Sequence, residues 1–285
     1  HYGSPDVLKF EEIEKPSVGE KDVLIRVCAA CVNPLDVGVL KGFGRLMGSG
    51  LLTPKHQVPG SDIAGREEAV GRLVTRFRPG DEVFGGNIWG GGAFAEYTCG
   101  AEDRLALKPV NLSFEQAAAV PVAAITALQG LRNKGRIKPG QKVLVDGASG
   151  GVGTFAVQIA KSFGAEVTAV CSTRNIKTAQ SIGADHVIDY SLEDFTRSAR
   201  RYDLILAANA YHSLSDYRRA LSLDGIFVWA GGRVSLAVML LGPFLSRTGR
   251  KKSGFFLAKL RRDDLAFMKD LLEAGKVVPV IDRRY

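Results

Sequence analysis

The alternation of apolar and polar positions divides the chain near residue 111. Before this point the apolar positions form short runs, such as Val23–Val27 and Val83–Phe84, separated by Gly and Pro turns. After it, short runs rich in Val, Ile and Leu alternate with longer helical patterns. Buried strands that alternate with helices are typical of a parallel sheet with helices on both faces. The pattern therefore predicts a mostly-β domain followed by an α/β domain.

The second half predicts a regular succession of strands and helices. The expected strands are 142–146, 166–170, 186–189, 203–207 and 225–230, with a further candidate at 254–258. The expected helices are 152–163, 175–182, 192–200, 213–221 and 263–274. This order predicts a parallel sheet with helices on both faces.

Composition places the chain among globular proteins. It has 285 residues, of which 46% are hydrophobic and 24% charged, which is enough for two cores. The apolar segment 236–245 is too short for a membrane span, and we interpret it as a buried or interface helix. No secretory signal is recognised, so we expect a reducing, cytoplasmic setting. Cys28 and Cys31 close an apolar run, and we interpret them as core cysteines rather than a redox pair.

The formal net charge of +8 is compatible with nucleic acid or with a polyanionic cofactor. No interleaving of basic and aromatic residues, which would stack nucleic-acid bases, is visible in the sequence. Nucleic-acid binding is therefore not expected as the main function.

The strongest motif is a glycine-rich loop between an expected strand and an expected helix. It reads Ala148-x-Gly150-x-x-Gly153. A small residue at 148 permits the tight turn, Gly150 lets the backbone approach a pyrophosphate, and Gly153 lets the helix pack on the strand. The helix N-terminus presents free N–H groups and a partial positive charge to the phosphates. The predicted dinucleotide contacts are Ser149, Gly150, Gly151, Val152 and Gly153.

The end of the next strand discriminates between NADH and NADPH. NAD-binding proteins favour an acidic residue here, whereas this chain carries Ser172 and Arg174, with Lys177 nearby. A hydroxyl and a guanidinium suit a 2′-phosphate, because Arg binds phosphate through a planar fork. The sequence therefore predicts NADPH.

Four stretches carry a family resemblance. They are Ala30-Cys-Val-Asn-Pro-Leu-Asp36, Val58-Pro-Gly-Ser-Asp-Ile-Ala-Gly65, Phe77-Arg-Pro-Gly-Asp-Glu-Val-Phe-Gly85, and the glycine loop together with Gly183-Ala-Asp-His-Val-Ile-Asp-Tyr190. The chain resembles the zinc-independent quinone oxidoreductase branch of the medium-chain dehydrogenase/reductase superfamily. The resemblance implies a GroES-like catalytic domain over 1–111, to which 259–285 return, and a Rossmann domain over 112–258. It also implies an active site in the cleft between the two domains.

The resemblance also assigns individual residues and a partner. It implies that Tyr190 lies near the adenosine 2′-phosphate and Thr126 near the nicotinamide. After the fourth expected strand the family carries an acidic residue and a glycine, where this chain reads Ala207-Ala-Asn-Ala-Tyr211, which leaves Asn209 as a donor. The family continues beyond the position of Tyr285 with strands that return to the β domain. A homodimer is expected, with segments 236–245 and 254–258 offering apolar surface.

The metal question follows from two positions. Zinc-using relatives place a Cys where this chain has Asn33 and a His where it has Ser61. Neither an amide nor a hydroxyl is a usual zinc ligand, and a catalytic zinc site uses three ligands drawn from Cys, His and carboxylate. We therefore expect no catalytic zinc.

Without a metal, the substrate carbonyl needs another polar partner. Hydride addition to a quinone or enone builds negative charge on oxygen, which the Asn33 amide could stabilise. Asn33 could equally be a turn residue before Pro34, and Asp36 could orient Asn33 or cap the next helix. The expected function is NADPH-dependent reduction of quinones or other conjugated carbonyl compounds. The alternatives are a zinc-free 2-enoyl thioester reductase, an alcohol dehydrogenase, and an NADPH-binding regulatory or RNA-binding protein.

Overall fold

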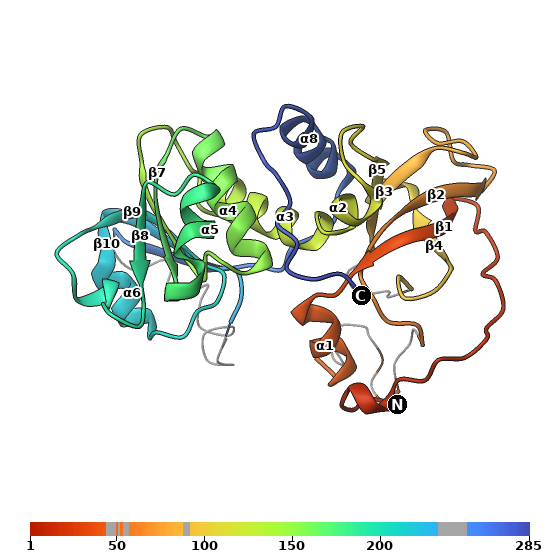
Figure 1. The fold of residues 1–285 in the computed structure, drawn as a ribbon, viewed down its shortest axis with the longest axis horizontal. Coiled ribbons are helices and arrows are strands. Elements are labelled where there is room, and N and C mark those ends of the chain that lie inside the picture. The colour runs from red at the N-terminus through yellow and green to blue at the C-terminus, as the bar shows by residue number, and fades with distance from the viewer. Residues whose placement is uncertain (44–49, 51, 54–56, 88–91, 233–249) are drawn as a thin grey trace. The chain divides into compact units, whose positions relative to one another are not determined.

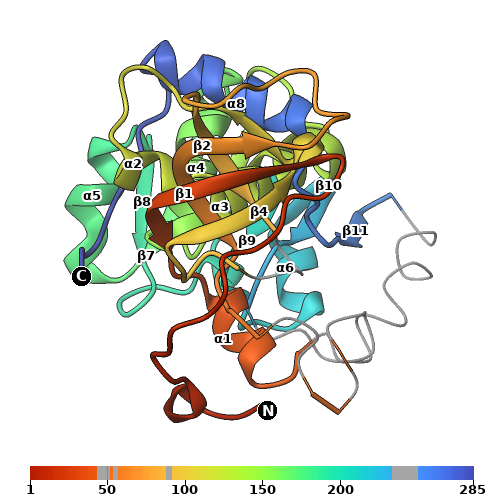
Figure 2. The ribbon, with the colours of Figure 1, turned by 90° about the vertical axis from the view of Figure 1, so that its right-hand side faces the viewer.

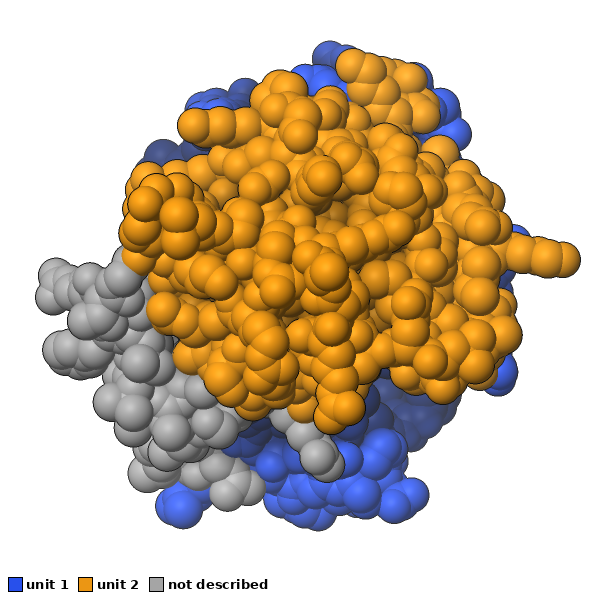
Figure 3. Space-filling view, turned by 90° about the vertical axis from the view of Figure 1, so that its left-hand side faces the viewer, with its two compact units in different colours: residues 1–122, 259–273, 281–285 blue, residues 123–258, 274–280 orange. Residues whose placement is uncertain are grey.

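The computed structural model describes residues 1–43, 50, 52–53, 57–87, 92–232 and 250–285 (Figure 1). The chain forms two compact units, coloured separately in Figure 3. The first comprises His1–Val122, Lys259–Glu273 and Ile281–Tyr285, and the second Ala123–Ala258 and Ala274–Val280. The segment 236–245, expected to be a buried or interface helix, lies outside the described residues.

The first unit is built on an antiparallel sheet of five strands in the order β4-β1-β2-β3-β5, of which β4, β1 and β2 are labelled in Figure 2. The strands are β1 (Asp22–Cys31), β2 (Asp62–Val70), β3 (Glu82–Gly86), β4 (Tyr97–Ala101) and β5 (Leu105–Leu107). Apolar side chains from alternate strand positions, among them Val23, Ile25 and Ile63, form its core with Phe77 and Leu105.

Short helices surround this sheet. They are η1 (Pro5–Val7), α1 (Pro34–Leu40), η3 (Glu102–Arg104), α2 (Phe114–Ala118) and α8 (Arg262–Glu273). Helix α2 packs against β1 and β2, which is why this unit extends beyond the expected boundary at residue 111. The end of α8 is fixed by Asn111, whose amide donates to the Leu272 carbonyl at 3.0 Å.

The second unit contains a parallel sheet of six strands in the order β11-β10-β9-β6-β7-β8. The strands are β6 (Lys142–Asp146), β7 (Glu166–Cys171), β8 (His186–Asp189), β9 (Tyr202–Ala207), β10 (Leu221–Trp229) and β11 (Lys252–Phe255). The order reverses at β6, and ligands of such sheets bind beyond the carboxyl ends of the strands at that reversal. The predicted Rossmann class is confirmed.

The helices of this unit are α3 (Pro121–Leu128, whose first two residues belong to the first unit), η4 (Gln129–Lys134), α4 (Gly151–Ser162), η5 (Thr173–Asn175), α5 (Ile176–Ser181), η6 (Phe195–Arg197) and α6 (Leu214–Ala220). Gln158 of α4 holds segment 274–280 through two bonds to Val278, of 3.0 Å and 2.8 Å. This explains why 274–280 belong to the second unit, although the sequence suggested that 259–285 would return to the first.

Two expectations from the sequence are wrong. The helix expected at 192–200 is only the 3-10 turn η6, because the Asp194 carboxylate accepts bonds from the Thr196 amide and hydroxyl, which compete with helical pairing. Cys28 is exposed and Cys31 half-buried, so they are not core cysteines. Since they stand three positions apart on β1, they point to opposite faces of the strand.

None of the described helices has both the length and the apolar character needed to cross a bilayer.

Candidate functional site

The glycine loop follows β6 directly and leads into α4. Gly147 has φ +79°, a conformation that glycine adopts without strain. Gly153 packs tightly, since a Cβ there would lie 2.1 Å from the Gly147 carbonyl oxygen. Gly150 is different, because its Cβ would meet only that same oxygen at 3.6 Å. The space in front of Gly150 is open, as a pyrophosphate needs.

The first turn of α4 faces this open space. Gly150 is the N-cap with extended dihedrals, φ −81° and ψ 171°, and no side chain caps the helix. The N–H groups of Gly151, Val152 and Gly153 have no acceptor within the helix. Ser149 and Val152 are half-buried, while Gly150 and Gly151 are exposed. These residues fit a dinucleotide, whose phosphates would accept from the free N–H groups.

Asp146 and Asn209 fix the loop from behind. The Asp146 carbonyl accepts from the Ala208 and Asn209 amides at 2.9 Å and 3.3 Å. A Cβ on Gly147 would lie 2.7 Å from the Asn209 Cβ, so Asn209 is directly beside the loop. The Asp146 carboxylate accepts from the Tyr217 hydroxyl at 2.5 Å, and burial raises its pKa to about 6. The sequence analysis missed this buried pair.

The ends of β7 and β8 bring together the residues predicted at the 2′-phosphate. The Tyr190 amide donates to the Cys171 carbonyl at 3.1 Å, which places Tyr190 beside the end of β7. Ser172 follows Cys171, and its hydroxyl accepts from the side-chain amide of Asn175 at 3.1 Å. Arg174 is exposed and forms no ion pair with any carboxylate of the described part of the chain.

Asp189 is an acidic neighbour that the sequence analysis did not weigh. It pairs with Cys171 across β7 and β8. Its carboxylate accepts from the Ser191 hydroxyl and amide at 2.6 Å and 2.9 Å and from the Thr173 hydroxyl at 2.5 Å. These bonds lower the pKa of Asp189 and occupy its oxygens. This carboxylate is therefore committed to local donors.

In the first unit, Asn33 stands at the centre of a buried polar network. Its side-chain amide nitrogen donates to the Asp62 carboxylate at 3.0 Å, and its backbone N–H donates to Asp36 at 2.7 Å. The Ser61 hydroxyl donates to the other Asp36 oxygen at 2.6 Å. Asp36 thus binds the backbone of Asn33 at the start of α1, within a capping box that also includes the Asn33 side chain. The side chain is oriented by Asp62, which the sequence analysis missed.

The two carboxyl groups of this network are unusual in their environment. Asp62 is fully buried. Besides the bond from Asn33, its carboxylate accepts from the backbone N–H of Val122, which lies 3.0 Å and 3.2 Å from its two oxygens. Burial raises its pKa well above the ordinary value. Burial also raises the pKa of Asp36, although bonds from Ser61 and Asn33 oppose the rise. Only 7% of Asn33 is exposed, and one of its two amide protons is engaged by Asp62.

The positions of Asn33 and Ser61 do not fit a zinc site. Both side chains are hydrogen-bonded to carboxylates, and neither is a usual zinc ligand. Among the described residues no three His, Cys, Asp or Glu side chains gather as a metal site.

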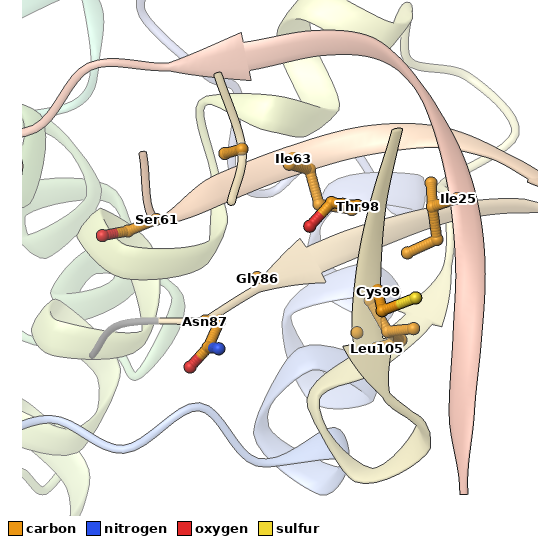
Figure 4. A pocket seen from close by; sticks show the side chains of 10 residues that line it. Ile25, Ser61, Ile63, Gly86, Asn87, Thr98, Cys99 and Leu105 are labelled. Carbon is orange, nitrogen blue, oxygen red and sulfur yellow. The ribbon is translucent and has the colours of Figure 1, made fainter. Parts of the chain in front are cut away.

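The recess beside Ser61 is too small for a substrate (Figure 4). Ser61 and Asn87 lie at one end and Ile25 and Leu105 at the other. Its volume of about 10 Å³ suits a single water molecule.

Thr126, predicted near the nicotinamide, is a buried residue of α3 in the second unit.

Comparison with known proteins extends over almost the whole chain. Residues 19–110 match the alcohol dehydrogenase GroES-like domain family, and 182–285 match the zinc-binding dehydrogenase family. A 2-methylene-furan-3-one reductase of Solanum lycopersicum is 38% identical over 99% of this chain and 69% of its own length. An NADPH-dependent chloroplastic alkenal/one oxidoreductase of Arabidopsis thaliana is 35% identical over 99% and 70%.

The fold comparison agrees with these relatives. The quinone oxidoreductase of Coxiella burnetii superposes with a TM-score of 0.85 at 28% identity, covering 99% of this chain and 88% of its own. A chloroplastic quinone-oxidoreductase of Triphysaria versicolor is 32% identical over 98% of this chain and 86% of its own length. The chain belongs to the zinc-independent quinone oxidoreductase branch of the medium-chain dehydrogenase/reductase superfamily and is an oxidoreductase of that family.

Proposed function

We propose that this protein uses NADPH to reduce quinones and other conjugated carbonyl compounds, by hydride transfer and without a catalytic metal. The observation that carries the proposal is the open space in front of Gly150, at the carboxyl end of β6 and the N-terminus of α4. The relatives are named for quinones, an alkenal/one and a 2-methylene-furan-3-one. These compounds share a C=C bond conjugated with a carbonyl group.

The reaction requires little protein chemistry beyond positioning. Bound NADPH would supply the hydride. The hydride forms a C–H bond at the carbon β to the carbonyl, the C=C electron pair moves toward the carbonyl carbon, and negative charge gathers on oxygen. The amide proton of Asn33 that Asp62 leaves free would donate to this oxygen. A solvent proton at the α carbon then completes the saturated carbonyl product of an enone. With a quinone, the added hydrogen is lost as a proton when the ring becomes aromatic, and both oxygens are protonated to give the hydroquinone.

Asp62 acts in this account as a positioning residue. Its bond to Asn33 fixes the rotation of the amide, so the second amide proton has one direction. Asp36 holds the backbone of Asn33 and Ser61 donates to Asp36, so neither needs to contact the substrate. Asp62→Asn should leave NADPH affinity unchanged, lower the rate of hydride transfer and alter its pH profile. An unchanged rate and profile would make Asp62 purely structural.

The preference for NADPH is supported by what surrounds Arg174. The guanidinium has no ion-pair partner among the described residues, and Ser172 and Tyr190 are close by on the ends of β7 and β8. The Asp189 carboxylate, at the end of β8, already accepts three hydrogen bonds. A 2′-phosphate would therefore find donors here, whereas a ribose hydroxyl would find no free carboxylate.

A panel of quinones and enones, each assayed with NADPH and NADH, tests the proposal. We expect oxidation of NADPH with several members of the panel, slower reaction with NADH, and full activity after exhaustive chelation. Activity lost on chelation, together with stoichiometric zinc, would contradict the metal-free mechanism. Reaction confined to 2-enoyl thioesters would favour the thioester reductase.

A homodimer also belongs to the proposal. Strand β11 forms an edge of the parallel sheet and could pair with its equivalent in a second copy. Sedimentation at micromolar concentration should give twice the chain mass, and a monomer would contradict this.

The cytoplasmic setting remains a prediction, since named relatives are chloroplastic or mitochondrial.

A further inference from the structure

The parallel sheet has a second concave site at the opposite edge from the glycine loop. A pocket of about 250 Å³ lies where β6, β7, β8 and β9 begin, entirely within the second unit. Lys142 at this edge opens β6, whereas Asp146 closes it before the loop. Four residues of strand separate the two ends by roughly 13 Å. The pocket is therefore distinct from the proposed cofactor site.

The floor of the pocket carries two buried hydroxyl groups. Thr168 and Tyr202 are 3% and 2% exposed. The Tyr202 hydroxyl has no hydrogen-bond partner of ordinary geometry within the described chain, although Thr168 and Arg200 are near enough to lower its pKa against the rise that burial causes. A buried hydroxyl without a partner is costly. An oxygen atom of a bound molecule would satisfy it.

The rim of the pocket is cationic. Lys142, Arg200 and Arg201 line it, and none of their side chains forms an ion pair in the part of the chain that the structure describes, although the Lys142 backbone N–H donates to the Asp203 carboxylate at 3.0 Å. Arg201 is held over the rim by two bonds from its guanidinium to the carbonyls of Ser198 and Arg200, both 2.8 Å long. The remaining lining residues are Glu166 and His186, which contact each other at 3.0 Å. The lining thus contains three cationic side chains without an ion-pair partner among the described residues and one carboxylate, which contacts His186.

We propose that this pocket binds a phosphate group, either as inorganic phosphate or as a small phosphate monoester. Guanidinium groups bind the oxygens of phosphate in a planar fork, and the Tyr202 hydroxyl can donate to one more oxygen. The volume lies below the roughly 300–1,000 Å³ of ordinary ligand sites, so a monoester that fits is compact.

Calorimetric titration with inorganic phosphate and with glycerol phosphate, at constant ionic strength, tests the proposal. Arg200→Gln/Arg201→Gln should weaken binding at least about tenfold, as expected for lost charge-assisted bonds. Arg76→Gln/Arg78→Gln removes the same charge from exposed positions of the first unit and should change affinity less than about twofold. Tighter binding of the monoester would identify it as the ligand class.

Two further results separate this pocket from the glycine loop and from a folding defect. NADPH should not compete with phosphate, because the two sites lie at opposite ends of β6. Tyr202→Phe should lower phosphate affinity about threefold to tenfold without lowering the thermal stability of the free protein, since its hydroxyl makes no bond there. Competition by NADPH, equal affinity in the Arg200/Arg201 double variant, or no binding by the wild type would overturn the proposal.

Discussion

The glycine loop of the second unit and the Asn33 network of the first differ in what builds them. The loop is made of backbone, and its shape depends on glycines at 147, 150 and 153. The network is made of side chains, with two buried carboxyl groups and no cation among their hydrogen-bond partners. Backbone geometry is independent of pH, whereas buried carboxyl groups are not. We therefore expect both the carboxyl groups of the first unit and Asp146 behind the loop to respond to protonation, whereas the loop backbone itself responds to added volume.

The largest expected effect concerns a buried carboxyl of the first unit. Glu67 of β2 is 3% exposed, and neither carboxylate oxygen has a partner among the described residues. Burial raises its pKa from 4.5 to about 8, with smaller contributions from Asp81 and Glu102. Because the folded state binds the proton more tightly than the unfolded state, the free energy of unfolding should fall between pH 4.5 and pH 8, by up to about 4 kcal/mol.

Glu67→Gln isolates this effect, since the amide stays neutral. The variant should match the wild type at pH 4.5 and be more stable at pH 9, as measured by denaturant unfolding at both pH values. An equal difference at the two pH values would show that Glu67 does not titrate in this range.

The second prediction concerns substitutions that add a methyl group to the glycine loop. Gly153→Ala forces a Cβ to 2.1 Å from the Gly147 carbonyl and should destabilise the protein by about 3 kcal/mol or more. Gly150→Ala, its matched control, has open space and permissible dihedrals, so it should cost no more than about 1 kcal/mol, the usual penalty of Ala at an N-cap. It should nevertheless weaken NADPH binding. Intact NADPH affinity in Gly150→Ala would mean that the open space is not the pyrophosphate site.

The third prediction concerns the hydrogen bond that the Asn33 amide would donate to the substrate oxygen. Asn33→Ala should slow hydride transfer on the order of 10²-fold, equivalent to about 3 kcal/mol, with little effect on NADPH affinity. Stopped-flow oxidation of bound NADPH separates the two quantities. Ser61→Ala is the control, because Ser61 contacts Asp36 and not Asn33. A wild-type rate in Asn33→Ala would make Asn33 a turn residue and Thr126 the next candidate.

The smallest effect concerns cofactor choice. Arg174→Ala should weaken NADPH binding by about 1.5–3 kcal/mol and leave NADH binding nearly unchanged, because only NADPH carries the 2′-phosphate. Lys177→Ala removes the same charge three residues along and should have a smaller effect. Fluorescence titration with both cofactors measures this, and equal losses for NADPH and NADH would refute the assignment.

The sequence located the glycine loop well and the side-chain network poorly, for physical reasons. Glycine spacing reports backbone geometry directly, so the loop could be located within a few residues. Asp62 stands 29 residues from Asn33, and their contact arises only when β1 and β2 pair. Asp62 belongs to the motif Pro59-Gly-Ser-Asp, but nothing in the spacing of that motif indicates Asn33 as its partner.

Some elements of the fold also left no pattern in the sequence. Residues 121–131 of α3 and η4 are buried on all sides, so their apolar positions show no helical period. The 192–200 segment has a helical pattern, but its polar side chains bond to the local backbone instead. The strands of the parallel sheet were located more accurately than these helices, because each is a short apolar run that is buried on both faces of the sheet.

Hydride transfer from NADPH to a conjugated carbonyl compound is the central claim, and isotope transfer tests it most directly. The wild-type protein is given NADPH labelled with deuterium at the reactive C4 position and a simple enone, and the product is analysed by mass spectrometry. The account predicts one deuterium at the carbon β to the carbonyl and a normal hydrogen from solvent at the α carbon. A product without deuterium at the β carbon, or no reduced product from any enone or quinone, would contradict it.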